Sequence, residues 1–541
     1  MNEKGSALAN TFSKLVNERE VLNTYWREAF QFSFPIRGQG FNHQADPLAS
    51  ASLAKTQQSM LYDSTASDSC RMLASSMIAG LTPTTQQWFS LSIPNIPDAQ
   101  IPRSVRYWLQ HSSETLHTMI HSSNYNAQAY EFFIDIAVGG MAGLYIEFDE
   151  QTGRMVFEEW ALDGLYVMDT QGLGRIDTVF RRCMLTCSEA MAKFGAEALP
   201  HAMKEEQRRD PLSNKRYPFI HCIKPRILRN GKQSNGKLAK ALPFESIYIC
   251  EKSKTIVYEG GYHEFPVVIP RWMTIPGTEY ALGPFNEALP DVKTLNKIVE
   301  MVLMNGEMAI AGTFVAKDDG VMNPHTTKIG PRRIIFAADT DNIKPLASGG
   351  NMQFATAEIQ RLQFQIRRNL MSDQLEPTNQ ERTLSAEQVR TRTQLVRQFL
   401  GPVFSRLQAE FLNPLIERCF GLAFRAGALG QPPEELAQFA FVPDYKSPLA
   451  KAQRMDDVMS MDRFEASLFN TINVLQDKSL LDLYDLDTAT QKRAEMLGIP
   501  VELVREQREV DQMRARRVQE QQAQQQAMAM AQAGQEPALA E

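Results

Sequence analysis

Two amphipathic helical patterns on either side of a short β-prone section constrain the fold of this chain more than any other feature. Residues 291–310 carry an apolar residue every three or four positions, and Pro290 is tolerated in the first turn of such a helix. The second pattern is marked by four apolar residues, Ile359, Leu362, Ile366 and Leu370. The intervening residues 312–351 end in the break Gly349-Gly350. We expect two helices whose apolar stripes are not fully covered by one another.

A polar loop and a very long helical stripe follow the second helix. Residues 373–382 contain a single apolar anchor, Leu375, and also Pro377, so this loop has almost nothing to bury. Beyond it, a helical stripe is formed by Val389, Val396, Phe399, Val403, Leu407, Phe411, Leu415 and Cys419. Pro402 and Pro414 fall within this stripe and are expected to bend the helix.

The rest of the chain changes from helical to β-type patterns and back. Apolar spacing predicts helices over residues 8–30, 57–80 and 105–121. Between residues 130 and 262, β-branched and aromatic runs separated by Gly and Asn turns predict strands. From Pro500 onward the sequence favours helix but is rich in Gln and Ala and lacks apolar periodicity. The predicted fold class is therefore α+β, predominantly helical.

Composition and charge exclude several classes of protein. A chain of 541 residues is expected to form roughly three or four folded units, and 43% hydrophobic with 22% charged residues is typical of a globular protein rather than a disordered one. The net charge of −6 excludes a global basic field that would hold nucleic acid. Six scattered cysteines indicate a reducing compartment. The amino terminus lacks a signal-peptide pattern, and the longest apolar run, residues 136–146, is too short to span a membrane.

The motifs that could carry chemistry are incomplete. Gly231, Gly236 and Lys237 have the spacing of a phosphate-binding loop, but Leu238 stands where a Ser or Thr must bind magnesium. His117 and His121 have the spacing of a zinc pair without the general-base Glu, and solvated helix histidines are the favoured interpretation. We therefore expect no catalytic residues, no metal site and no cofactor, and hence not an enzyme.

Two clusters of basic residues stand out in the nearly neutral chain. Residues 201–240 carry eleven Lys and Arg against three acidic residues. This basic patch is either a solvated surface hairpin or a docking site for an acidic partner or a phosphate backbone, and its members are Arg208, Arg209, Lys215, Arg216, Lys224, Arg226, Arg229, Lys232, Lys237 and Lys240. The smaller cluster lies between the two amphipathic helices and comprises Lys328, Arg332 and Arg333.

Short motifs follow one another in a fixed order along nearly the whole chain. The early ones are Arg19 with Trp26 and Pro35, Tyr62-Asp63-Ser64-Thr65, Leu73-Ala74-Ser75, Gly80-Leu81-Thr82-Pro83 and Trp88-Phe89. The middle ones are Pro270-Arg271-Trp272, Tyr280-Ala281-Leu282-Gly283-Pro284 and Ala288-Leu289-Pro290-Asp291. The later ones are Ser385-Ala386-Glu387, Gly401-Pro402-Val403, Asn413-Pro414-Leu415, Ser447-Pro448-Leu449-Ala450 and Gly498-Ile499-Pro500. Each is weak alone, but their order resembles the head-to-tail connecting, or portal, proteins of short-tailed, T7-like bacteriophages.

This resemblance implies a portal fold of wing, stem, clip and crown. Such proteins form a ring, typically of twelve subunits, at one vertex of the capsid. The resemblance implies a wing over residues 1–283, a stem helix over 284–311, a clip over 312–352 and a returning stem helix over 353–372. A channel loop over 373–383, a long wing helix over 384–448 and a crown with the Gln-rich tail over 449–541 would follow.

The resemblance also implies a function, partners and sites. The ring would be a channel for double-stranded DNA during packaging and ejection, located in the virion at the head-tail interface and assembled in the host cytoplasm. Its channel loop would present Asp373, Gln374, Glu376, Asn379, Gln380 and Glu381. The clip cluster Lys328, Arg332 and Arg333 would dock the terminase large subunit and later the tail adaptor proteins. Other implied partners are the major capsid protein, the scaffolding protein, tail tube proteins and internal ejection proteins, with no membrane.

Two alternatives remain open from the sequence. The chain could be another virion component, such as a tail adaptor or internal ejection protein, although the order of helix, β-prone section and helix disfavours this. A nucleic-acid-processing ring ATPase is disfavoured by Leu238 and by the absence of any second nucleotide motif. For residues 373–382, the alternative to a channel loop is an ordinary surface turn between helices.

Overall fold

The computed structural model describes residues 2–42, 54–93, 101–211, 213–227, 234, 238–311, 314–317, 334–337, 352–372, 403, 405–438, 442–445, 448–475, 484–497, 499, 504–505 and 507–533. The chain divides into two compact units. Unit 1 comprises Met1–Gln86 and Thr115–Ala428, and unit 2 comprises Gln87–Glu114 and Leu429–Glu541. The mixture of helices and sheets confirms the predicted α+β class.

A five-stranded antiparallel sheet forms the largest β layer of unit 1. Its strand order is β4-β5-β6-β7-β8, a meander in chain order. The strands are β4 (Leu165–Met168), β5 (Thr178–Thr186), β6 (Arg216–Pro225), β7 (Phe244–Cys250) and β8 (Thr255–Tyr262). Two of them, β5 and β7, were predicted from β-branched and aromatic runs at 177–182 and 246–249. A third such run, at 155–160, falls in β3 (Arg154–Trp160) of the neighbouring sheet, and these predictions are confirmed.

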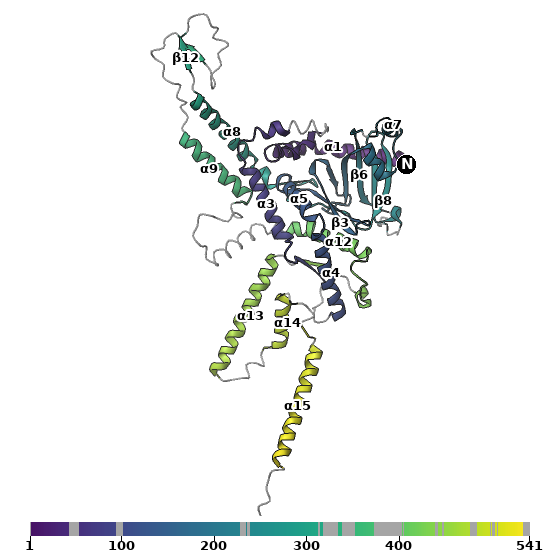
Figure 1. The fold of residues 1–541 in the computed structure, drawn as a ribbon, viewed down its shortest axis with the longest axis vertical. Helices are drawn as coiled ribbons and strands as arrows, with labels where there is room; N and C mark the ends of the chain where they lie inside the picture. The colour runs from purple at the N-terminus through teal and green to yellow at the C-terminus, as the bar shows by residue number, and fades with distance from the viewer. Residues whose placement is uncertain are drawn as a thin grey trace, which may run out of the picture. The chain divides into compact units, whose positions relative to one another are not determined.

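Helices cover both faces of this sheet because its strands alternate apolar side chains on two sides. On one face, α1 (Asn2–Gln31) packs Leu8, Phe12 and Leu15 against residues that include Ile220 and Ile247. On the other face, α6 (Cys187–Phe194) and α7 (His201–Arg209) form a second core whose sheet residues are Tyr217, Phe219, Tyr248, Cys250 and Val257. Figure 1 shows α1, α7 and the strands β6 and β8 grouped together in unit 1.

A second sheet has the strand order β3-β2-β9. Its strands are β2 (Gly143–Asp149), β3 (Arg154–Trp160) and β9 (Val267–Val268), and a hairpin of β10 (Met273–Thr274) with β11 (Ala281–Leu282) follows. The edge strand β3 is covered by α5 (Tyr125–Gly139) and the residue before it. Asn124 both donates to the carbonyl of Phe157 at 2.7 Å and accepts from its N–H at 2.9 Å. These side-chain bonds satisfy backbone groups that an open sheet edge would expose.

Two long helices, α8 (Pro284–Ala311) and α9 (Met352–Asn369), correspond to the two amphipathic patterns. The periodic pattern alone began at residue 291, but α8 runs through Pro290 and starts at Pro284, which matches the bounds 284–311 that the resemblance implied for this helix. Phe285, Ala288 and Leu289 are buried, so packing of this first stretch outweighs the backbone hydrogen bond that Pro290 cannot donate. The α3 helix (Thr65–Leu81) is also shorter than the pattern 57–80 suggested.

The long helical stripe is described only from residue 403 onward, and there it contains a π-helical turn. Gln408–Leu412 is π-helical and α12 (Asn413–Arg425) follows directly. Pro414 cannot donate to the carbonyl of the fourth preceding residue, and the N–H of Asn413 donates to Gln408, five residues back. The irregularity expected at Pro414 is therefore present as a wider turn. Glu410 in this turn accepts hydrogen bonds from Arg271, from the backbone N–H at 2.9 Å, from Nε at 3.2 Å and from Nη2 at 2.5 Å.

Unit 2 joins an early segment of the chain to its end. Strand β1 (Phe89–Ser92) pairs antiparallel with β14 (Val442–Tyr445), with Phe89 opposite Tyr445. Helix α4 (Arg103–His121) begins in unit 2 and continues into unit 1. The remaining helices of unit 2 are α13 (Pro448–Leu475), α14 (Leu486–Leu497) and α15 (Gln507–Ala533). Residues 87–114, grouped with the N-terminal part in the sequence analysis, thus belong to the same compact unit as the C-terminal residues.

Candidate functional site

Helices α8 and α9 pack side by side and make up the first candidate site (Figure 1). The first half of α8 is held in unit 1 by an apolar face formed by Phe285, Ala288, Leu289, Val292 and Leu295. On α9 and just after it, Leu362, Ile366 and Leu370 are at most 1% exposed. Their spacing of four residues puts them on one face, as the sequence pattern predicted. The pair is therefore anchored at one end by ordinary core packing.

Several other large apolar side chains of the pair are exposed, most of them beyond the anchored end but Phe364 between the buried Leu362 and Ile366. Met301 and Met304 of α8 are 55% and 51% exposed, and Leu303 beside them is also exposed. On α9, Phe354 and Phe364 are 68% and 58% exposed. Large apolar side chains gathered on two adjacent helices are typical of an interaction surface. We call these five residues the exposed apolar face. Leu303 belongs to the stripe predicted for α8, so the expected incomplete coverage is confirmed there, whereas the other four lie outside the predicted stripes.

Two pairs of oppositely charged side chains form within these helices. Lys297 and Glu300 of α8 are 2.8 Å apart, and Nε of Arg361 donates to Glu358 of α9 at 2.9 Å. The hydrogen bond from Arg361 lowers the pKa of Glu358, and the hydrogen bond to Glu300 raises the pKa of Lys297. Both pairs are ionised at neutral pH, so the two helices carry no net charge from them.

The predicted channel-loop and clip residues fall outside the described part of the chain. This applies to Asp373, Gln374, Glu376, Asn379, Gln380 and Glu381, and to Lys328, Arg332 and Arg333. Within the β-prone section, two short strands are described, β12 (Phe314–Lys317) and β13 (Ile334–Ala337). They pair in parallel, with Phe314 opposite Ile334.

The described members of the basic patch lie at two ends of β6. Arg208 and Arg209 are exposed at the end of α7, Lys215 pairs with Glu206 at 3.0 Å, and Arg216 begins the strand. The other described members, Lys224, Arg226 and Lys240, lie at or beyond the far end of the strand. At ~3.3 Å per residue, ten strand residues separate the two groups by about 30 Å. The structure therefore does not bring the whole patch together.

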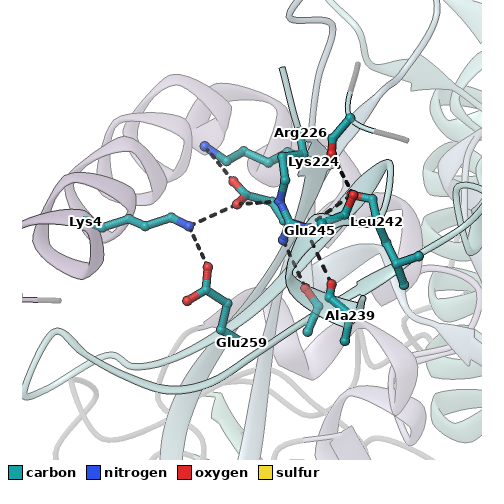
Figure 2. A network of polar contacts seen from close by, with 10 residues as sticks. Lys4, Lys224, Arg226, Ala239, Leu242, Glu245 and Glu259 are labelled. Carbon is teal, nitrogen blue, oxygen red and sulfur yellow. Dashed lines mark hydrogen bonds and ion pairs between the residues drawn. The ribbon is translucent and has the colours of Figure 1, made fainter. Parts of the chain in front are cut away.

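The second group, at the far end of β6, is bound to carboxylates and carbonyls of the protein itself (Figure 2). Lys224 lies 3.1 Å from Glu245, and Arg226 donates to the carbonyls of Leu242 and Gly260 at 3.2 and 3.3 Å. Lys240 lies in the turn before β7, whereas Arg229, Lys232 and Lys237 are outside the described residues. The turn Ala239–Ala241 and strand β7 occupy the place where a phosphate-binding loop would require a helix.

Glu245 is the centre of this network. It accepts from Lys4 of α1 at 3.0 Å, and Lys4 also donates to Glu259 at 2.9 Å, as Figure 2 shows. Burial by itself would raise the pKa of Glu245, but the bonds from Lys4 and Lys224 outweigh burial and hold it below its ordinary value. Lys4 thus ties α1 to the sheet through Glu245 and Glu259, while Lys224 and Arg226 are engaged within the sheet and its turns.

A second buried ion network was not predicted from the sequence. Arg37, in the turn Arg37–Asn42 after α1, donates from Nε to Asp135 at 2.7 Å and from Nη2 to Glu159 at 3.0 Å, and it also contacts Glu131. Burial, and next the charge of Asp135, raise the pKa of Glu159 to about 9. The available signal was Asp135 at the edge of a long apolar run, since a buried carboxylate requires a partner.

The buried side chain of Arg19 also joins segments that are far apart in the sequence. Its side chain is fully buried, and Nη1 donates to the carbonyl of Leu162 at 3.0 Å. The guanidinium lies 3.7 Å from the ring centre of Tyr166. Burial lowers the pKa of Arg19. The motif residue Arg19 therefore holds a turn between β3 and β4 against α1.

The described residues contain no group of three or more His, Cys, Asp or Glu side chains arranged to hold a metal ion. His117 lies 3.1 Å from the carbonyl of Gln86, and His121 lies 3.1 Å from Asn126, so these rings have protein partners. All six cysteines are free thiols, among them Cys183 and Cys187. Within the described part of the chain, no helix is both long and apolar enough to cross a membrane.

Comparison with known proteins gives matches over nearly the whole chain. The family described as bacteriophage head to tail connecting protein matches residues 5–504. A probable portal protein of Bordetella phage BPP-1 is 25% identical over 534 residues, which cover 96% of this chain and 92% of the relative. The portal protein of Salmonella phage epsilon15 is 26% identical over 539 residues, covering 97% and 93%. The matched region includes both compact units and the α8–α9 pair.

Proposed function

The chain belongs to the bacteriophage head to tail connecting protein family, and we propose that it assembles into a ring, of twelve subunits as is typical for portals, at one capsid vertex. Proteins of this family are structural components of the phage particle at the head-tail junction. The observation that carries the proposal is the family match over residues 5–504, together with two portal proteins that align over more than nine tenths of their own lengths.

Contact between neighbouring subunits is supported by the exposed apolar face. Met301 and Met304 on α8 and Phe364 on α9 are each more than half exposed in the single chain. Burying such side chains is favourable by about 1.5–3 kcal/mol each. Repeating one heterologous contact around an axis closes a ring when the rotation between copies fits. A second copy of the chain is therefore the partner that this surface fits within the proposed ring.

The ring would be a passage for double-stranded DNA in packaging and ejection. The polar residues 373–383, directly after α9, would line the channel with Asp373, Glu376 and Glu381. Carboxylates repel phosphates, and a channel that neutralised many phosphates would bind DNA instead of releasing it. A net charge of −6 per chain supports a low-friction channel rather than a DNA-binding one.

Docking is assigned to the segment between the stem helices. Lys328, Arg332 and Arg333 would bind the terminase large subunit during packaging and tail adaptor proteins afterwards. Exposed charges act mainly on association rate and on choice of partner. The major capsid protein and the scaffolding protein would contact the wing during assembly in the host cytoplasm. Internal ejection proteins and tail tube proteins are the remaining proposed partners.

Electron microscopy of the purified protein tests the ring directly. We expect class averages with an axial hole and, by light scattering, a mass that is an integral multiple of 61.1 kDa. Assembly should be measured with and without scaffolding protein. A stable monomer at micromolar concentration under both conditions would contradict the proposal.

A further inference from the structure

The segment from Met60 to Ser69 crosses the anchored end of the α8–α9 pair and binds both helices. Its hydrogen bonds to α8 are made with the side-chain amide of Asn296. Nδ2 of Asn296 donates to the carbonyl of Met60 at 3.0 Å, and Oδ1 accepts from the N–H of Tyr62 at 2.7 Å. The amide thus pairs with the backbone on both its donor and its acceptor side, which fixes orientation as well as distance.

The same segment binds α9 through two further side chains. Nε2 of Gln363 donates to Asp63 at 2.8 Å. The other oxygen of Asp63 accepts from the N–H of Thr65 at 2.8 Å, so this carboxylate is itself oriented by the start of α3. Just beyond α9, the hydroxyls of Ser372 and Ser69 are 3.0 Å apart and both residues are buried. We call Asn296, Gln363 and Ser372, with their partners, the strap contacts.

These contacts lie where the helix pair leaves the core of unit 1. The apolar side chains nearest to them, Leu295 of α8 and Leu362 and Ile366 of α9, are buried. Met301 and Met304, one to two turns further along α8, are exposed. Apolar packing tolerates small rotations because it is non-directional, whereas hydrogen bonds with a fixed donor and acceptor do not. The strap contacts are thus the directional element at the base of the pair.

We propose that the strap contacts set the direction of the α8–α9 pair and thereby the number of subunits in the ring. The inference rests on the ring and on the exposed apolar face as the subunit contact. In a closed ring the rotation between neighbours is fixed by the angle at which this face leaves the rest of the subunit. A small change of that angle changes the number of copies that closes. Asn296, Gln363 and Ser372 are therefore positioning residues.

The test uses the full-length chain with the substitutions Asn296→Ala and Gln363→Met, singly and together. Methionine keeps the length of glutamine and removes the donor. The matched control is Gln360→Met, because Gln360 is an exposed glutamine on the same helix. The primary measurement is the distribution of subunit numbers by native mass spectrometry, and thermal melting by circular dichroism is measured in parallel.

We expect the double variant to raise the fraction of rings with a subunit number different from wild type about tenfold, because two or three directed bonds separate the competing geometries. The control should keep the wild-type distribution.

A lowered melting temperature with an unchanged distribution of subunit numbers would overturn the inference, since it would show that the contacts only stabilise the fold. If the double variant does not fold, Ser372→Ala takes its place with the same readout and the same two outcomes. Absence of rings in the wild type would contradict the proposed ring itself, a different result from unchanged rings in the variants.

Discussion

Nε of Arg37 donates a hydrogen bond to Asp135 at 2.7 Å and so joins the turn after α1 to a helix 98 residues further along the chain. Asp135 is 2% exposed, and the same guanidinium also binds Glu159 at 3.0 Å. One cation therefore serves buried carboxylates from both α5 and β3. The network holds the N-terminal helix α1 against α5. Because α8 packs against both α1 and α5, the network also helps to position the start of α8.

Replacing Arg37 should destabilise unit 1 strongly. Arg37→Met leaves the buried carboxylate of Asp135 without its cation, and removing one partner of a buried pair costs about 3–5 kcal/mol. The control is Arg71→Met, because Arg71 and Asp68 form an exposed pair for which the expected cost is about 0–1 kcal/mol. Denaturant unfolding of the subunit measures both. Equal, small losses for the two variants would contradict a buried network at Arg37.

The same network predicts a pH dependence of stability. Burial and the charge of Asp135 raise the pKa of Glu159 from 4.5 to about 9 in the folded chain. A carboxyl with a raised pKa binds its proton more tightly when folded, so its contribution to stability is full below pH 4.5 and is lost as the pH rises toward 9. Glu159→Gln should remove this part of the dependence. We expect the variant to gain stability relative to wild type at about pH 8 and not at about pH 4. A difference in melting temperature between variant and wild type that stays the same from about pH 4 to about pH 8 would contradict the raised pKa.

The end of α9 is predicted to prefer glycine. Met371 has a φ of 58°, in the left-handed region that costs a residue with a Cβ roughly 1 kcal/mol or more. Comparing Met371→Gly with Met371→Ala separates this effect from loss of the methionine side chain. The glycine variant should be more stable than the alanine variant by about 1 kcal/mol, the reverse of the order inside a helix. An alanine variant of equal or higher melting temperature would show that this backbone conformation is not kept.

Charges on the exposed apolar face should prevent assembly without unfolding the subunit. Met304→Asp and Phe364→Asp place a carboxylate where the ring contact is proposed, and we expect each to weaken association by about 2 kcal/mol or more per contact. The control is Leu173→Asp, because Leu173 is 75% exposed on a loop of unit 1 away from α8 and α9. Light scattering over a range of concentrations measures association. Normal rings from both face variants would exclude this surface as the contact.

The channel loop provides the sharpest functional prediction. Replacing Asp373, Glu376 and Glu381 together with Lys should leave folding and rings intact, yet retard or arrest DNA packaging, because the new cations would bind phosphates. A control with the same change of charge reverses three exposed carboxylates elsewhere in unit 1, Glu18, Glu150 and Glu197. Packaged DNA per particle is the measurement. Particles with the loop variant that package and retain a full genome at the normal rate would show that residues 373–383 do not face the channel.

Much of the local structure followed from periodicity. The pattern over 105–121 predicted α4 within two residues at its start, and the patterns over 8–30 and 359–370 predicted α1 and α9. These predictions succeed because burial of one helical face selects the residues at every third or fourth position. Periodicity alone placed the start of α8 at residue 291, and the earlier start at 284 came from the family resemblance; packing of Phe285 and Leu289 continues the helix through Pro290. Which residues touch across the chain could not be predicted in this way.

The candidate site was predictable in part. The incomplete coverage of the α8 and α9 stripes was visible as apolar spacing that extended beyond what two helices could bury. The basic patch was identified from charge alone, and some of its described cations have individual partners, such as Glu206 for Lys215 and Glu245 for Lys224. Sequence distance does not reveal that Glu245 would stand beside Lys224 on paired strands. The strap contacts were likewise invisible, since they join residues more than two hundred positions apart.

By itself, the sequence determined the secondary-structure pattern, the absence of a complete catalytic motif and the family, because these depend on residue types and spacings along the chain. Only the tertiary structure decided that residues 87–114 join the C-terminal part in unit 2, that Arg37 neutralises Asp135, and that Asn296 holds Met60 and Tyr62. Such contacts depend on which elements meet in space. That choice is made by packing of the whole core, and no local pattern records it.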